Sequence, residues 1–74
     1  MRPYVFEYGG AVFEIRFMRG LDCLSACIVR DGVSTGRWLH ILDRRDRPEA
    51  AIRRTLIAEC IADVTDGGHG GARN

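Results

Sequence analysis

The chain has 74 residues, of which 46% are apolar and 28% are charged, and its formal net charge is +1. This length allows one domain, and the composition is that of a globular rather than a disordered protein. A net charge near zero argues against strong non-specific binding to nucleic acid. The eleven basic residues are all arginine, which either codon usage in a G+C-rich genome or bidentate contacts with phosphate or carboxylate groups can explain.

The unbroken apolar stretches are only a few residues long, whereas a membrane-spanning helix needs about 20 apolar residues. The first three residues lead directly into a strand pattern that contains Glu7, so we expect no signal peptide and a cytoplasmic location. An odd number of cysteines argues against a disulfide framework. We therefore expect reduced thiols and no membrane partner.

A first β-hairpin is predicted on either side of Gly9-Gly10. In residues 3–8 and 11–18, aromatic or other apolar side chains occupy every second position. A Gly-Gly dipeptide between two such runs is typical of a two-residue loop. Cross-strand partners share a face. A two-residue loop therefore places the aromatic residues of both strands together, with these pairs: Tyr8 with Ala11, Phe6 with Phe13, and Tyr4 with Ile15.

A second pair of strands is predicted at about 22–30 and about 33–42. The first is expected to follow a turn near Arg19-Gly20, and Asp31-Gly32 between the two strands is typical of a type I′ hairpin turn. Continuing the alternation adds five apolar residues to the aromatic face of the sheet: Leu24, Ala26, Ile28, Leu39 and Ile41.

A C-terminal helix is predicted from about Arg47 to Thr65. Asp46 and Glu49 have capping-box spacing, and Pro48 would sit in the first turn, where proline is tolerated. Apolar residues recur every four positions along one stripe, which would cover the aromatic face: Ile52, Leu56, Cys60 and Val64. Gly67-Gly68 would stop the helix, and the glycine-rich tail 67–74 is expected to be disordered.

The predicted fold class is therefore α+β, a four-stranded antiparallel meander with one C-terminal helix packed on one face, as a single domain over residues 1–66. The expected core lies between the helix stripe and the aromatic face, whose contributing residues are Tyr4, Phe6, Phe13, Ile15, Phe17, Leu24, Ile28, Leu39 and Ile41. One helix covers only one face of the sheet, so the second face must meet water or a partner.

This second face is the first candidate functional site. It is more apolar than a solvated sheet surface, and it mixes Trp, Met and Arg as interfaces do. The candidate protein-binding residues are Val12, Glu14, Arg16, Cys27, Val29, Trp38 and His40. The partner would be another protein or a second copy of the chain. The alternative is an ordinary monomer surface on which Trp38 lies flat over the backbone.

A nucleic-acid-associated module is the rival hypothesis. It would use an arginine cluster at the last loop and the start of the helix, because helix N-termini attract phosphate; the candidate phosphate-binding residues are Arg44, Arg45, Arg47 and Arg54. Three acidic residues interrupt this cluster, namely Asp43, Asp46 and Glu49. The cluster is therefore also consistent with a solvated, locally paired loop.

Metal binding and catalysis are not predicted. On a strand, Cys23 and Cys27 would lie about 13 Å apart at ~3.3 Å per residue, so they cannot share one zinc ion. Cys23 and His40 could be cross-strand neighbours, which would give two ligands where a structural zinc site needs four. A cysteine nucleophile beside His40 would lack an orienting third group. We expect no enzyme, no metal, no cofactor and no small-molecule substrate.

The sequence thus favours a small non-enzymatic protein-binding module, an adaptor or an inhibitor, acting through the open face of the sheet. Small arginine-rich single-domain proteins suit phage or mobile-element genomes, where inhibitors of host defence complexes occur. That context is an expectation about origin and does not follow from individual residues.

Overall fold

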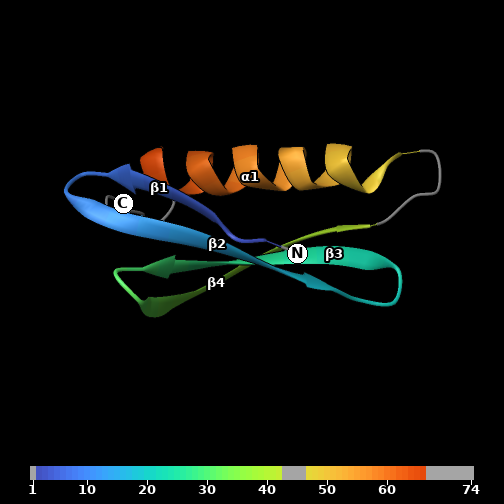
Figure 1. Cartoon of the computed structure of the whole chain (residues 1–74), viewed down its shortest axis with the longest axis horizontal. Helices are drawn as coiled ribbons and strands as arrows, with labels where there is room; N and C mark the ends of the chain where they lie inside the picture. Colours follow the sequence, from blue (N-terminus) through green and yellow to red (C-terminus); the bar gives the residue numbers. More distant parts are fainter. Residues whose placement is uncertain (1, 43–46, 67–74) are drawn as a thin grey trace.

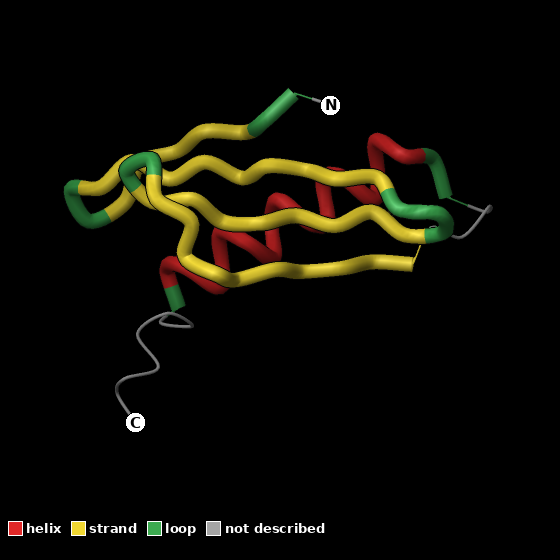
Figure 2. The backbone as a smooth tube through the Cα atoms, turned by 90° about the horizontal axis from the view of Figure 1, so that it is seen from below, coloured by secondary structure: helices red, strands yellow, loops and turns green. Residues whose placement is uncertain are grey.

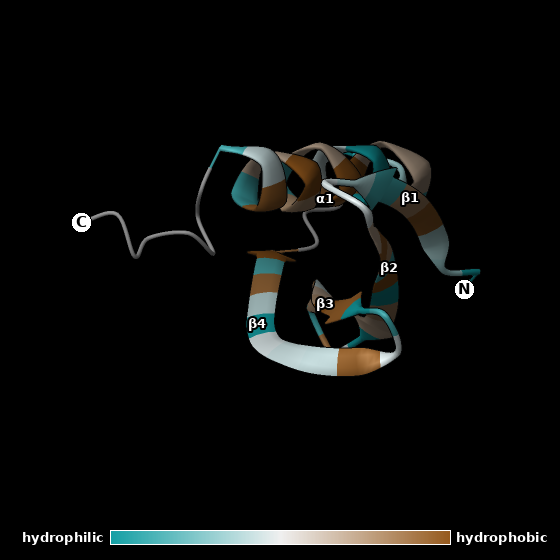
Figure 3. Ribbon diagram, turned by 90° about the vertical axis from the view of Figure 1, so that its left-hand side faces the viewer, coloured by the Kyte–Doolittle hydropathy of each residue, from teal (hydrophilic) through white to brown (hydrophobic). Residues whose placement is uncertain are grey.

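The computed structural model describes residues 2–42 and 47–66. Four strands are followed by one helix: β1 (Tyr4–Tyr8), β2 (Ala11–Arg19), β3 (Cys23–Arg30), β4 (Val33–Leu42) and α1 (Glu49–Thr65). The strands form one antiparallel sheet in the order β1-β2-β3-β4, and α1 covers one face of it (Figure 1). Figure 3, which views the molecule from its end, also shows α1 on one side of the sheet. The predicted α+β meander with a C-terminal helix is confirmed.

The first hairpin has the predicted register. Phe6 pairs with Phe13 and Tyr4 pairs with Ile15 across β1 and β2. The rings of Phe6 and Phe13 are stacked, with centroids 5.3 Å apart. The Gly-Gly loop therefore places the aromatic side chains of both strands on one face, as the alternation indicated.

The β3–β4 turn is of the predicted type. Asp31 (φ 50°) and Gly32 (φ 85°) both have positive φ, as a type I′ turn requires. The turn is also tied to β2, because Asp31 Oδ1 accepts a hydrogen bond from the Val12 N–H at 2.9 Å. In return the Asp31 N–H donates to the Val12 carbonyl at 2.7 Å. One aspartate thus joins the turn of the second hairpin to the strand beside it.

A bulge interrupts β4 soon after this turn. Val29 pairs with Ser34 but Cys27 pairs with Trp38, so β4 has two more residues than β3 in this stretch. Gly36 lies within the bulge at φ 82°, a conformation that costs glycine little. The Thr35 hydroxyl donates to the Ile28 carbonyl at 2.8 Å and accepts from the Arg37 N–H at 3.2 Å. A shift of two residues leaves every side chain on its own face but changes its cross-strand neighbour.

The core lies between the face of the sheet that α1 covers and the apolar stripe on α1. Its largest side chains are less than 2% exposed: Ile15, Leu24, Ile28, Ile52, Leu56 and Cys60. The predicted helix stripe is confirmed, with all four members buried, and Phe6, Phe17, Leu39 and Ile41 pack partly buried around the centre. The prediction of Tyr4 in the core is wrong, since this side chain is 37% exposed. β1 is an edge strand, and α1 packs mainly against β3 and β4.

The start of the helix also differs from the prediction. α1 begins at Glu49, and its N-cap is Pro48 in an extended conformation (φ −69°, ψ 151°) with no side-chain cap. The helix thus begins two residues after the predicted start at about Arg47, and Asp46, the predicted capping-box partner of Glu49, lies outside the described residues. A residue that precedes proline is sterically disfavoured in the α region, which accounts for the later start. At the other end the Asp66 N–H donates to the Ala62 carbonyl; the predicted disordered tail lies outside the described residues.

Candidate functional site

The helix-free face of the sheet is named here the open face. It faces the viewer in Figure 2, with α1 behind the strands. Five of its apolar side chains are between 44% and 61% exposed: Val5, Val12, Met18, Trp38 and Leu42. They come from β1, β2 and β4, so the exposed apolar surface extends across the sheet rather than along one strand. Several exposed apolar side chains on one face are a feature of interaction sites more than of solvated surfaces.

The middle of the open face is a cross-strand row of three residues. Arg16 pairs with Cys27, and Cys27 pairs with Trp38. The Arg16 guanidinium donates from Nη2 to Glu14 Oε1 at 3.1 Å. This hydrogen bond and the charge of Glu14 raise the pKa of Arg16 above its ordinary value. The row therefore presents the Trp38 ring on one side of Cys27. On the other side is Arg16, whose charge is offset by that of Glu14.

Trp38 is held by a chain of contacts that leads to a buried serine. Its ring is stacked on that of His40, with centroids 6.4 Å apart and planes 9° from parallel. His40 Nδ1 lies 2.6 Å from the Ser25 hydroxyl oxygen, and Ser25 is buried, at 7% exposure. Since the imidazole is fixed at one end, the indole above it has a defined orientation before any partner arrives. Rigid aromatic side chains of this kind lose little entropy on binding.

Ser25 was not predicted as a site residue, and the cause is the bulge in β4. Without extra residues in β4, a two-residue turn at Asp31-Gly32 would place His40 opposite Cys23. The structure instead pairs Ser25 with His40 and Cys23 with Leu42. The pairing of Cys23 with His40 considered from the sequence is therefore wrong. The correct partner of His40 could have been assigned only by predicting that the bulge adds two residues to β4.

The predicted protein-binding residues fall into three groups by exposure. Val12, Arg16, Trp38 and His40 are exposed, and Glu14 and Cys27 are partly buried. Val29 is 3% exposed, on the open face between its cross-strand neighbours Glu14 and Ser34. It supports the patch from below instead of offering surface to a partner.

The Ser25–His40 contact resembles the first half of a catalytic triad, but the described residues do not complete it. Within residues 2–42 and 47–66, no carboxylate forms a hydrogen bond with His40, and the Ser25 side chain is nearly inaccessible. A triad needs a third group that orients the base. The described residues also contain no cluster of three or more metal-ligating side chains and no helix suited to cross a membrane.

The predicted phosphate-binding cluster is only partly described. Arg44 and Arg45 lie outside the described residues, whereas Arg47 and Arg54 are exposed. Their neighbour Arg53 serves the fold: its guanidinium lies 4.9 Å from the centroid of the Phe17 ring and donates to the Arg2 carbonyl at 3.0 Å. The nucleic-acid hypothesis stays a prediction that a salt-dependent binding assay can test.

Comparisons of this chain with protein-family models, with curated proteins and with solved structures find no match.

Proposed function

We propose that this chain is a non-enzymatic protein-binding module and that the open face is its docking surface. The observation that carries the proposal is the exposure of Val5, Val12, Met18, Trp38 and Leu42 on one helix-free face. Trp and Arg are the residue types that most often dominate interface energetics. Here Trp38 and Arg16 flank Cys27 in one cross-strand row, which supplies both in the middle of the surface.

The occupant that we propose is a second copy of the chain. A two-fold axis through the open face brings the same patch of both copies together, and sheets commonly pack face to face. The face carries both signs of charge, because Arg16 and Glu14 pair within one copy, so two such faces would meet without net repulsion. The molecule measures 37 × 26 × 17 Å, and the two longer dimensions accommodate the ~800 Å² per partner of a standard interface.

Dimerisation would also answer a stability problem that follows from size. A chain of 74 residues forms a small core and leaves a large share of its surface accessible. Closing the open face would bury the five exposed apolar side chains at about 25 cal/mol per Å² of apolar area. The folded monomer and the dimer are then linked by mass action, so the apparent stability rises with protein concentration.

The test is the solution mass of the full chain by light scattering, measured from micromolar to millimolar concentration. We expect a concentration-dependent dimer. The Trp38→Ala variant should dissociate about 30-fold more readily, because truncation of a hot-spot residue costs about 2 kcal/mol or more. Leu21→Ala is the matched control, since Leu21 is fully exposed in the loop between β2 and β3 and off the open face.

Three results would contradict the proposal. The wild type remains monomeric at millimolar concentration; Trp38→Ala dimerises as well as the wild type; or Leu21→Ala weakens the dimer as much as Trp38→Ala does. Circular dichroism of each variant establishes that it is folded. A second variant, Arg16→Glu, replaces the Arg16–Glu14 pair of each copy with two carboxylates and should weaken the dimer by repulsion between the two faces.

A further inference from the structure

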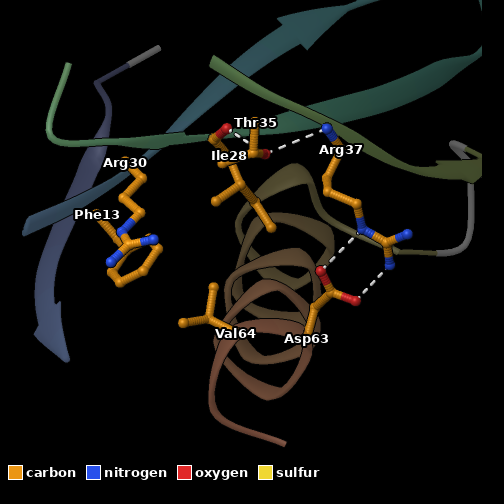
Figure 4. Close-up of a pocket in the computed structure, with 7 residues that line it drawn as sticks. All are labelled: Phe13, Ile28, Arg30, Thr35, Arg37, Asp63 and Val64. Atoms are coloured by element: carbon orange, nitrogen blue, oxygen red, sulfur yellow. Dashed lines mark hydrogen bonds and ion pairs between the residues drawn. The ribbon is translucent and has the colours of Figure 1, made fainter. Parts of the chain in front are cut away.

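A pocket of about 230 Å³ lies on the helix side of the sheet, away from the open face. It is formed where the last turns of α1 pass beside β2, the end of β3 and the bulge of β4 (Figure 4). Three of its lining residues are core side chains, each less than 5% exposed: Phe13, Ile28 and Val64. The other four carry polar groups: Arg30, Thr35, Arg37 and Asp63.

The two arginines at this pocket differ in how their charges are satisfied. Arg37 donates from Nε to Asp63 Oδ2 at 3.0 Å and from Nη2 to Asp63 Oδ1, a bidentate pair. This pairing raises the pKa of Arg37 above its ordinary value. Arg30 instead lies over the Phe13 ring, with its guanidinium carbon 5.9 Å from the ring centroid. Within residues 2–42 and 47–66, Arg30 has no carboxylate partner.

Among the described residues, the guanidinium of the exposed Arg30 is thus the one positive charge at this pocket without a carboxylate partner, and it lies above an apolar floor. Thr35 does not alter this balance, because its hydroxyl already donates to the Ile28 carbonyl and accepts from the Arg37 N–H. In Figure 4, Arg30 and the Arg37–Asp63 pair stand on opposite sides, with Ile28 and Val64 between them. A ligand that enters this space meets carbon on its sides and a guanidinium at one end.

We propose that this pocket binds a small organic monocarboxylate with a compact apolar body. A carboxylate matches the planar donor fork of one guanidinium and its single charge. Inorganic phosphate would place a more highly charged, strongly hydrated group against the apolar floor at a desolvation cost. The volume is below the ~300–1,000 Å³ of pockets for drug-sized ligands, so the ligand is about the size of benzoate. The site is independent of the open face.

Titration of the isotope-labelled full chain with benzoate, followed by amide chemical shifts, tests this proposal. We expect saturable shifts confined to residues around the pocket, with a Kd on the order of 1 mM or tighter for so small a ligand. Benzamide has the same shape without the charge and should bind about tenfold more weakly. Inorganic phosphate should produce no saturable shifts at the pocket.

Two arginine variants distinguish the effect of the Arg30 charge on binding from the effect of the protein's overall charge. Arg30→Gln should weaken benzoate binding about tenfold, whereas Arg2→Gln, which removes an exposed charge near the start of the chain, should leave it unchanged. Amide spectra of both variants report their folding. If Arg30→Gln does not fold, the comparison of benzoate with benzamide on the wild type decides the matter.

Three results of these titrations would overturn the proposal. Benzoate produces no saturable shifts; benzamide binds as tightly as benzoate; or the two arginine variants weaken benzoate binding equally. A carboxylate at the end of a polypeptide shares this chemistry, so N-acetylphenylalanine is included as its mimic. It should bind more weakly than benzoate, because the pocket is too small for an added peptide unit. Tighter binding of this mimic would overturn the small acid as the ligand and would indicate a polypeptide C-terminus instead.

Discussion

Cys60 should make the protein lose stability at alkaline pH. This residue belongs to the buried stripe of α1 and is 0% exposed. Burial raises the pKa of its thiol from 9.0 to about 11, and the charges of Asp63 and Glu59 add to the effect. The unfolded chain has no such environment. The folded and unfolded states therefore bind different numbers of protons between pH 9 and pH 11.

The direction of the effect follows from proton linkage. Below pH 9 the thiol is protonated in both states and contributes no pH dependence. Between pH 9 and about 11 the unfolded thiol ionises first, so the free energy of unfolding falls as the pH rises. One pKa unit corresponds to about 1.4 kcal/mol, so the full loss is about 3 kcal/mol. This is a large share of the ~5–15 kcal/mol that stabilises an ordinary domain.

Urea denaturation followed by far-UV circular dichroism measures this loss at a series of pH values. Cys60→Ala should be less stable than the wild type at neutral pH, because it leaves a small cavity, but its stability should fall less between pH 9 and 11. Cys23→Ala is the matched control, since this thiol is only partly buried, and it should retain the steep fall of the wild type. Parallel curves for the wild type and Cys60→Ala would refute the reasoning.

Three further predictions concern the core, the bulge and the support of the open face. Leu56→Ala removes a side chain that is 0% exposed and should lower the free energy of unfolding by about 2–5 kcal/mol in urea denaturation; a loss below about 1 kcal/mol would contradict the packing. Gly36→Ala should cost about 1 kcal/mol or more, because φ is 82° there, and Gly36→Asn should cost less. Ser25→Ala removes the hydrogen bond to His40, so it should cost about 0.5–1.5 kcal/mol and weaken the near-UV dichroism of Trp38; an unchanged near-UV spectrum would show that Ser25 does not fix the indole.

Local patterns were sufficient for most of the fold. Gly9-Gly10 between two alternating runs determined the first register, because a two-residue loop leaves one pairing that keeps aromatic partners together. The four-residue spacing of Ile52, Leu56, Cys60 and Val64 located the buried side of α1. Each of these features depends on neighbours in sequence, which is why residue order alone revealed them.

The partners on the open face and the pocket depend on contacts that local patterns do not contain. The bulge shifts β4 by two residues, and this leaves the alternation of Trp38 and His40 unchanged while it replaces their cross-strand partners. The pocket requires Arg37 to reach Asp63, 26 residues further along the chain. Arg30 became a candidate because that pair leaves its charge without a carboxylate partner in the part of the chain that the structure describes. No spacing in the sequence indicates either contact.

The bulge in β4 also affects how copies of the chain can aggregate. The sheet has two free edges, a five-residue strand at β1 and the interrupted strand at β4. Edge strands that are long and straight act as templates for further strands and can seed cross-β fibrils. A short edge on one side and a bulged edge on the other offer a poor template. Growth by strand addition is therefore disfavoured, and Gly36→Ala variants that straightened β4 would be expected to form fibrils more readily.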